Sequence, residues 1–216
     1  MSDNKDSSEL KGFSPELSAL RGAKQKIYFA AKKRKMELCE FIFKKRIKGN
    51  LIIFRKTQFG ADKIMKMLDK RGMTAVCIHT EKTANEKADA LKRFSNDSAN
   101  ILVITDKAFK NITVKKADMI INFDVPAYIE DFVARFGTLK PKGSVHTFCA
   151  VDEKPIIKEI EAQIDRRFLV NKDHPFNDDL EEFTSEARRT KNNDVKSNGT
   201  KSRKSAGSKN KKKRWY

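Results

Sequence analysis

The sequence predicts an α/β domain with an open, mostly parallel β-sheet and helices on both faces. Short apolar runs alternate with helical patterns along most of the chain, and the loops between them are short. Leu51–Phe54 is continuously apolar, as is typical of a parallel strand covered on both faces, and Ile101–Thr105 is the most hydrophobic run of the chain. The 216 residues leave room for one such domain and a tail.

The first half of the domain alternates between strands and helices that the periodicity of apolar residues defines. Gly49 and Asn50 mark a turn, and Gly72 marks the end of a helix. In chain order we expect a strand over Lys26–Ala30, a helix over Arg34–Lys45, a strand over Leu51–Phe54, a helix over Ala61–Lys70 and a strand over Ala75–His79.

The second half continues this alternation. Thr83, followed three residues later by Glu86, forms a capping box that starts a helix running to Phe94. The most hydrophobic run, Ile101–Thr105, is expected to be the central strand. The remaining expected elements are strands over Met119–Phe123 and His146–Ala150, helices over Tyr128–Arg135 and Lys154–Ile164, and an edge strand over Arg167–Val170.

Composition divides the chain into three parts. Residues 1–24 are predicted to be a flexible N-terminal arm, residues 25–178 the folded domain, and residues 179–216 a disordered, Lys-rich tail. Lys and Arg outnumber Asp and Glu by 47 to 29, which gives a net charge of +18. Because this excess is concentrated after Ala187, the tail is strongly basic and the domain mildly so. Such a balance favours a polyanionic partner, RNA or DNA, over a membrane.

Cysteine usage and hydropathy exclude several protein classes. Cys39, Cys77 and Cys149 each lie in an apolar run, and no two form a C-x-x-C pair. This pattern predicts reduced, buried thiols in a cytoplasmic protein, with neither a disulfide framework nor a zinc site. No apolar run approaches the roughly 18 residues of a membrane span, so no membrane partner is expected.

The sequence lacks the short motifs of a stand-alone catalyst. It contains no G-x-x-x-x-G-K-S/T loop, no G-x-S-x-G, no H-E-x-x-H and no G-x-G-x-x-G. The histidines, His79, His146 and His174, do not have the spacing of metal ligands. We therefore expect no catalytic residue and no bound metal in this chain alone.

Ligands of open parallel sheets bind at the carboxyl ends of the strands, and those ends are polar here. The strongest candidates for contacts with an RNA backbone follow the second and fourth strands. They are Phe54, Arg55, Lys56, Thr57, Thr105 and Asp106. Thr105 and Asp106 have an alternative role, which is only to cap the turn that follows them.

Several stretches resemble, in order and spacing, the motifs of one family. LIIFRKTQFGADKI is similar to helicase motif IV, IHTEKTANEKADALKRF to I-H-G-x-K-S-Q-x-x-R-x-x-A-L-x-x-F, and ILVITDKAFKNITV to motif V. INFDVPAYIEDFVARFGTLKPKG is similar to I-N-F/Y-D-x-P followed by motif VI, and DEKPIIKEIEAQI and KDHPF to the end of the RhlE type. Residues from Ile27 to about Phe176 therefore resemble the second, C-terminal RecA-like domain of a DEAD-box RNA helicase, closest to the RhlE type.

The chain departs from this family at the nucleotide-facing end of motif VI. Arg135 and Gly137 match the motif, whereas Ala134 stands where the family has histidine. Thr138 and Pro141 stand at the positions of the two arginine fingers. Since an arginine finger contributes roughly 10³–10⁵ in rate, this loop resembles a motif VI that has kept its structural part and lost its catalytic part.

Motif V and the RNA-facing Q-x-x-R motif are altered as well. Lys110, Asn111 and Thr113 replace the Arg, Gly and Asp of motif V, and Ala84 and Lys87 replace the Gln and Arg of Q-x-x-R. Lys110 and Lys87 keep the positive charge without the forked geometry of arginine, so both remain candidate RNA contacts.

The resemblance implies a degenerate, truncated helicase relative that binds RNA without hydrolysing ATP itself and needs no cofactor. The expected RNA is single-stranded or structured, with low sequence specificity. From the tail, we expect Lys211, Lys212, Lys213 and Arg214 to contribute. Two alternatives remain open: a subunit completed by a partner that carries the first RecA-like domain, and a protein-interaction module in an RNA-processing or ribosome-assembly complex. A decayed gene fragment is a third.

Overall fold

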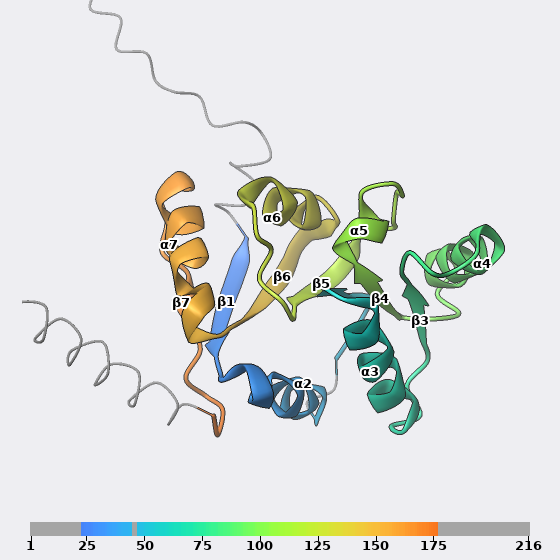
Figure 1. Ribbon diagram of the computed structural model, residues 1–216, viewed down its shortest axis with the longest axis horizontal. Coiled ribbons are helices and arrows are strands. Elements are labelled where there is room, and N and C mark those ends of the chain that lie inside the picture. Colours follow the sequence, from blue (N-terminus) through green and yellow to red (C-terminus); the bar gives the residue numbers. More distant parts are fainter. Residues whose placement is uncertain (1–22, 45–46, 177–216) are drawn as a thin grey trace, which may run out of the picture. The chain divides into compact units, whose positions relative to one another are not determined.

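The structure, a computed structural model, describes residues 23–44 and 47–176, and these residues form a seven-stranded parallel sheet (Figure 1). The strand order is β3-β4-β2-β5-β6-β1-β7, and every pair of neighbours runs parallel. The strands are β1 (Lys24–Phe29), β2 (Leu51–Arg55), β3 (Ala75–Ile78), β4 (Ile101–Thr105), β5 (Ala117–Asn122), β6 (Leu139–Cys149) and β7 (Leu169–Val170). The predicted α/β class is confirmed.

Helices cover both faces of this sheet (Figure 1). They are α2 (Lys35–Lys44), α3 (Gln58–Asp69), α4 (Ala84–Ser95), α5 (Asp106–Phe109), α6 (Ile129–Phe136) and α7 (Lys154–Gln163), with 3-10 turns at η1 (Lys32–Arg34) and η2 (Val151–Glu153). On one face α2 and α3 pack against the strands in one apolar cluster, and on the other face α4 to α7 contribute to two more.

Alternate residues of the apolar strands enter different cores. In β2, Leu51 and Ile53 face the core under α2 and α3, whereas Ile52 and Phe54 face the opposite core. All four side chains are fully buried. This two-sided burial explains why β2 and β4 are continuously apolar instead of alternating with polar residues.

Two expected features differ from the structure. Ile101–Thr105 is fully buried, but β4 is the second strand from the β3 edge, and β5 occupies the middle of the seven described strands. Helix α3 begins at Gln58, three residues before the expected Ala61, because Thr57 acts as its N-cap and accepts a hydrogen bond from the Gly60 N–H at 3.1 Å.

The turn and cap signals are otherwise confirmed. Thr83 and Glu86 form the predicted capping box at the start of α4. Gly49 and Gly72 have φ values of 80° and 65°, in the left-handed region that glycine adopts without a steric penalty. These glycines therefore fix where the chain enters β2 and where it leaves α3.

The stretch expected to be a loop around motif VI is instead the first part of β6. The predicted strand covered only His146–Ala150, whereas β6 begins at Leu139. Leu139 pairs with Ala117 and Ser144 with Met119, so residues 140–143 bulge out of the ladder with β5. Pro141 lies in this bulge, where its missing N–H interrupts no ladder hydrogen bond.

The buried thiols match expectation in part. Cys39 and Cys149 are buried, and burial raises the pKa of each to about 12, which leaves both unreactive. Cys77 is only half-buried. Among residues 23–44 and 47–176, no helix has the length and apolar character to span a bilayer. Nearly all of the predicted arm and the whole of the predicted tail lie outside the described residues.

Candidate nucleic-acid interface

The carboxyl ends of β2, β4 and β5 lie side by side because these three strands are parallel neighbours. Charged residues stand at or just after these strand ends: Arg55 is the last residue of β2, Asp106 follows β4, and Asp124 lies two residues after β5. The helix that follows, α6, contributes Arg135 to the same region. The sheet thus brings together the charged groups that the sequence placed in separate loops.

Arg135 is the most enclosed charge in this region, with a side chain that is only 1% exposed. Its Nε and Nη2 donate to the two carboxylate oxygens of Asp106 at 2.9 and 2.8 Å. Its Nη1 donates to Asn122 Oδ1 at 3.0 Å and to the Asp124 carbonyl at 2.9 Å. The guanidinium also lies 4.9 Å from the ring centroid of Phe54. Arg135 therefore ties α6 to the ends of β4 and β5.

Burial raises the pKa of Asp106, and the adjacent guanidinium of Arg135 opposes that shift. Asp106 remains the charged partner of a bidentate, buried ion pair, which is the geometry in which arginine and carboxylate bind most strongly. The sequence placed Thr105 and Asp106 as RNA contacts or as caps. Thr105 occupies the N-cap position of α5 without a side-chain capping hydrogen bond and is 3% exposed, while Asp106 binds Arg135.

Arg55 is held in a second, shallower network. Its guanidinium lies 3.8 Å from the centroid of the Phe123 ring, and its Nη1 is 3.2 Å from Asp124 Oδ2. The same carboxylate accepts a hydrogen bond from the Lys56 N–H at 2.8 Å. A Cβ at Gly60 would clash with the guanidinium, so this glycine leaves the space in which Arg55 lies. The side chain is only 12% exposed.

The remaining predicted contacts differ in their access to solvent. Phe54 is fully buried, so its side chain packs beneath Arg135 and cannot contact RNA itself. Lys56 and Thr57 are exposed. The Lys110 side chain is 61% exposed, and its Nζ lies 3.2 Å from Asp131 Oδ1. Lys87 is half-buried, and its Nζ donates a hydrogen bond to the Thr80 carbonyl oxygen at 3.4 Å.

The residues at the end of motif VI also point inward. Gly137 ends α6, and its N–H donates to the Val133 carbonyl at 3.0 Å. Thr138 is buried, and its hydroxyl donates to the Arg135 carbonyl at 2.7 Å. Its own carbonyl accepts from the N–H of Ala117, the first residue of β5, so Thr138 lies at the amino end of the sheet. The predicted tail contacts Lys211, Lys212, Lys213 and Arg214 lie outside the described residues.

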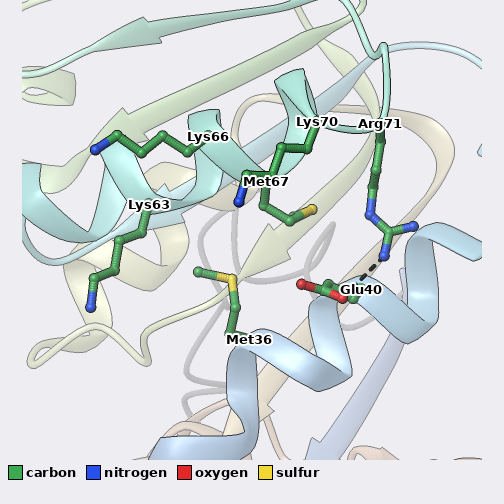
Figure 2. Close-up of a pocket in the computed structure, with 7 residues that line it drawn as sticks. All are labelled: Met36, Glu40, Lys63, Lys66, Met67, Lys70 and Arg71. Atoms are coloured by element: carbon green, nitrogen blue, oxygen red, sulfur yellow. Dashed lines mark hydrogen bonds and ion pairs between the residues drawn. The ribbon is translucent and has the colours of Figure 1, made fainter.

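A basic groove of about 440 Å³ between α2 and α3 was not anticipated from the sequence. Figure 2 shows the side chains of Met36 and Met67 pointing into the space between the two helices. Its lining residues are Met36, Glu40, Lys63, Lys66, Met67, Lys70 and Arg71. The single acid among them, Glu40, pairs with Arg71 at 3.1 Å. This leaves three exposed lysines on one side of the groove.

The lysine spacing was the signal that sequence reasoning overlooked. Lys63, Lys66 and Lys70 are separated by three and four residues, which places them on one face of a helix. Phe59, one turn before Lys63, is 68% exposed, and the Lys63 ammonium lies 4.5 Å from its ring centroid. We call these four residues, Phe59, Lys63, Lys66 and Lys70, the α3 face.

Comparison with protein families identifies one match to the sequence. Residues 33–138 match the helicase conserved C-terminal domain. Among curated relatives, the ATP-dependent RNA helicase DBP8 of Lodderomyces elongisporus is 29% identical over 144 residues, which is 63% of this chain and 32% of that protein. The DEAD-box ATP-dependent RNA helicase 20 of Arabidopsis thaliana is 28% identical over 151 residues, 68% of this chain and 30% of that protein.

Solved structures with the same fold include helicase domains. The C-terminal domain of the DEAD-box protein Dbp5 superposes with a TM-score of 0.64 at 18% identity, covering 75% of this chain and 97% of that one. The E. coli DEAD-box protein SrmB, in a structure in which it is bound to the regulator of ribonuclease activity A, gives 0.63 at 20% identity, with 69% and 90% coverage. The chain spans about a third of the length of the two curated relatives named above.

Proposed function

We propose that this chain, whose residues 33–138 match the helicase conserved C-terminal domain, carries the C-terminal RecA-like domain of a DEAD-box helicase and binds RNA. We propose further that it supplies no catalytic residue for ATP hydrolysis. Its similarity to the RhlE type in particular stays a prediction. The proposal has two parts, an RNA-binding surface of exposed lysines and an arginine of motif VI that serves the fold.

The observation that carries the RNA-binding part is the α3 face. One exposed aromatic ring and three exposed lysines follow one another along a single helix that starts at the carboxyl edge of the sheet. Lysines along such a line suit the phosphates of a single strand, and an exposed ring can stack on an unpaired base. Lys56 and Lys110 are further exposed lysines, which follow β2 and β4 at the carboxyl edge.

This set of groups favours RNA binding with little sequence preference. Lysine contacts phosphate as a point charge and reads no base edge, and stacking accepts any base. Arg55 and Arg135, which could make forked contacts, are covered and paired with Asp124 and Asp106. The proposed partner is therefore single-stranded RNA, recognised mainly through its backbone.

The geometry of Arg135 supports the second part of the proposal. Turning this side chain toward a nucleotide would break four hydrogen bonds and leave the Asp106 carboxylate without its partner. The neighbouring Thr138 hydroxyl is engaged with the backbone of α6. Neither residue can present a cation to a phosphate from this arrangement, which supports a domain that uses no nucleotide cofactor.

RNA binding to the full-length chain tests the first part. Fluorescence anisotropy with a labelled oligo(U) single strand, over a series of salt concentrations, gives both affinity and salt dependence. Changing Lys63, Lys66 and Lys70 together to Gln removes three phosphate contacts and should lower the salt slope by roughly 2 units, at about 0.7 per contact.

The matched control changes three other exposed lysines, Lys92, Lys116 and Lys158, to Gln. Both triple variants lose the same total charge, so a general electrostatic effect would weaken them equally. If the two variants bind alike, the α3 face is not the binding surface. The tail is tested separately by removing residues 187–216, which hold twelve Lys and Arg and one acid. We expect this truncation to flatten the salt slope further.

A protein partner is the second candidate, and the basic groove is the observation that favours it. Methionine side chains adapt to irregular apolar surfaces, so Met36 and Met67 could receive an apolar residue of a peptide while the lysines contact its acidic side chains. The related SrmB was solved bound to a protein. Unchanged RNA binding in the Lys63, Lys66 and Lys70 variant would favour this candidate, including a partner that supplies a first RecA-like domain.

A further inference from the structure

His79 is a buried imidazole without good hydrogen bonds. It follows the edge strand β3 and is 5% exposed. Its Nδ1 has no hydrogen-bond partner among the described residues, and its Nε2 lies 3.6 Å from Asp62 Oδ1, beyond normal hydrogen-bond distance. Buried polar atoms are almost always satisfied, so an imidazole in this state indicates a missing partner.

Two other metal-ligating groups surround this imidazole. Cys77 lies two residues earlier on β3, so its side chain projects from the same face of the strand. Asp62 reaches the same place from α3. One ligand atom from each of Asp62, Cys77 and His79 lies within 4.8 Å of the other two. This group could not be recognised from the spacing of histidines or of cysteines, because its three ligands are of different types and come from α3 and from the end of β3.

We propose that Asp62, Cys77 and His79 bind a zinc ion that links α3 to the edge strand β3. A sulfur, a nitrogen and an oxygen ligand form the mixed set that Zn²⁺ accepts, whereas Mg²⁺ and Ca²⁺ prefer oxygen alone. Three protein ligands leave the fourth tetrahedral position to water. This inference does not depend on RNA binding.

The geometry requires only a small adjustment. Ligand atoms at 2.0–2.3 Å from Zn²⁺ lie roughly 3.5 Å apart, somewhat closer than they are here. Asp62 has a side chain that is 52% exposed, so it can change rotamer without disturbing the core. The Lys82 ammonium, which acts electrostatically on Cys77, lies 2.9 Å from Glu86 Oε1, and this ion pair reduces its repulsion of an entering ion.

Cobalt binding to the untagged, reduced, full-length chain tests this proposal. Co²⁺ occupies zinc sites and gives a near-ultraviolet charge-transfer absorption only when a thiolate is bound. We expect one Co²⁺ per chain with this absorption, and we expect added Zn²⁺ to abolish it by displacement. Zn²⁺ should also raise the thermal unfolding temperature of the chain.

Two variants and one control make the assignment specific. Cys77→Ser should abolish the charge-transfer absorption, and Asp62→Asn, a change at an exposed position, should weaken Co²⁺ binding at least tenfold. Asp69→Asn, at the other end of α3, should bind Co²⁺ as the unaltered chain does. Far-UV circular dichroism checks that each variant is folded. The proposal is overturned if the unaltered chain shows no such absorption, or if Asp62→Asn binds Co²⁺ as tightly as Asp69→Asn.

Discussion

Replacing Asp106 by Asn would separate the structural role of Arg135 from a nucleotide-binding role. The substitution keeps the size of the side chain but removes the charge that pairs with the guanidinium. Arg135 is 1% exposed and cannot recover its hydration, whereas the Asp106 side chain is 24% exposed. The substitution therefore lowers the free energy of unfolding mainly because the buried guanidinium of Arg135 is left without its counter-ion.

The magnitude follows from the number of contacts that remain. Removing one partner of a buried ion pair costs about 3–5 kcal/mol. After the change, Nη1 of Arg135 still donates to Asn122 and to the Asp124 carbonyl, and the new amide oxygen accepts one further hydrogen bond. We therefore expect the lower end, a loss of about 3 kcal/mol in the free energy of unfolding. This is a large share of the 5–15 kcal/mol typical of a domain.

Urea unfolding followed by far-UV circular dichroism measures this loss. With a typical slope of about 1–3 kcal/mol per molar urea, the midpoint should fall by roughly 1–3 M. Asp131→Asn is the matched control, because Asp131 pairs with Lys110, a cation that is 61% exposed. That surface pair should contribute no more than about 1 kcal/mol.

Equal and small losses in the two variants would refute the reasoning. In that case the guanidinium of Arg135 would not depend on Asp106 and would be available to contact a nucleotide. The proposal that motif VI serves the fold in this chain would then lose its main support.

Three further predictions concern stability. Burial and the nearby Lys26 lower the pKa of His146 to about 4, whereas the unfolded chain binds a proton at this residue below about pH 6.5. Unfolding at a series of pH values should therefore show that roughly 3 kcal/mol of the free energy of unfolding is lost between pH 6.5 and 4. His146→Gln should abolish this loss. Thr83→Ala removes the capping box of α4 and should cost about 1 kcal/mol by urea titration, whereas Thr80→Ala should cost less. Gly143→Ala places a Cβ 2.9 Å from the Asp118 carbonyl oxygen and should cost about 1–3 kcal/mol; an unchanged midpoint would contradict the packing of the β6 bulge.

The order and type of the elements could be predicted because each depends on local patterns. The capping box at Thr83 and the left-handed glycines at Gly49 and Gly72 act within a few residues. Strand order is a different matter, because β1 pairs with β6 and β7, far away in sequence. Ile101–Thr105 was expected to be the central strand because it is the most hydrophobic run. Hydrophobicity reports that helices bury both faces of a strand, but it does not say which strands lie on either side.

The candidate site could be predicted as a region but not in the roles of its residues. Sequence reasoning placed Arg55 and Asp106 at the carboxyl edge, and they are there, whereas it identified Arg135 only as a match to motif VI. It could not show that Asp106 binds Arg135, since the two are 29 residues apart and meet through the packing of α6 on the sheet. The lysines of the α3 face were missed because they lie outside the motifs, although their spacing was readable.

The bulge in β6 bears on how this domain tolerates sequence change. Leu139 and Ser144 keep their partners on β5, and the residues between them are free of the ladder. Substitutions at residues 140–142 leave the pairing on either side intact, so they cost little in folding, whereas Gly143 is constrained by its close approach to Leu139 and to the Asp118 carbonyl oxygen. Pro141, which elsewhere in a paired strand would break it, shows this tolerance directly. A segment with so weak a constraint can change in sequence while the sheet around it persists.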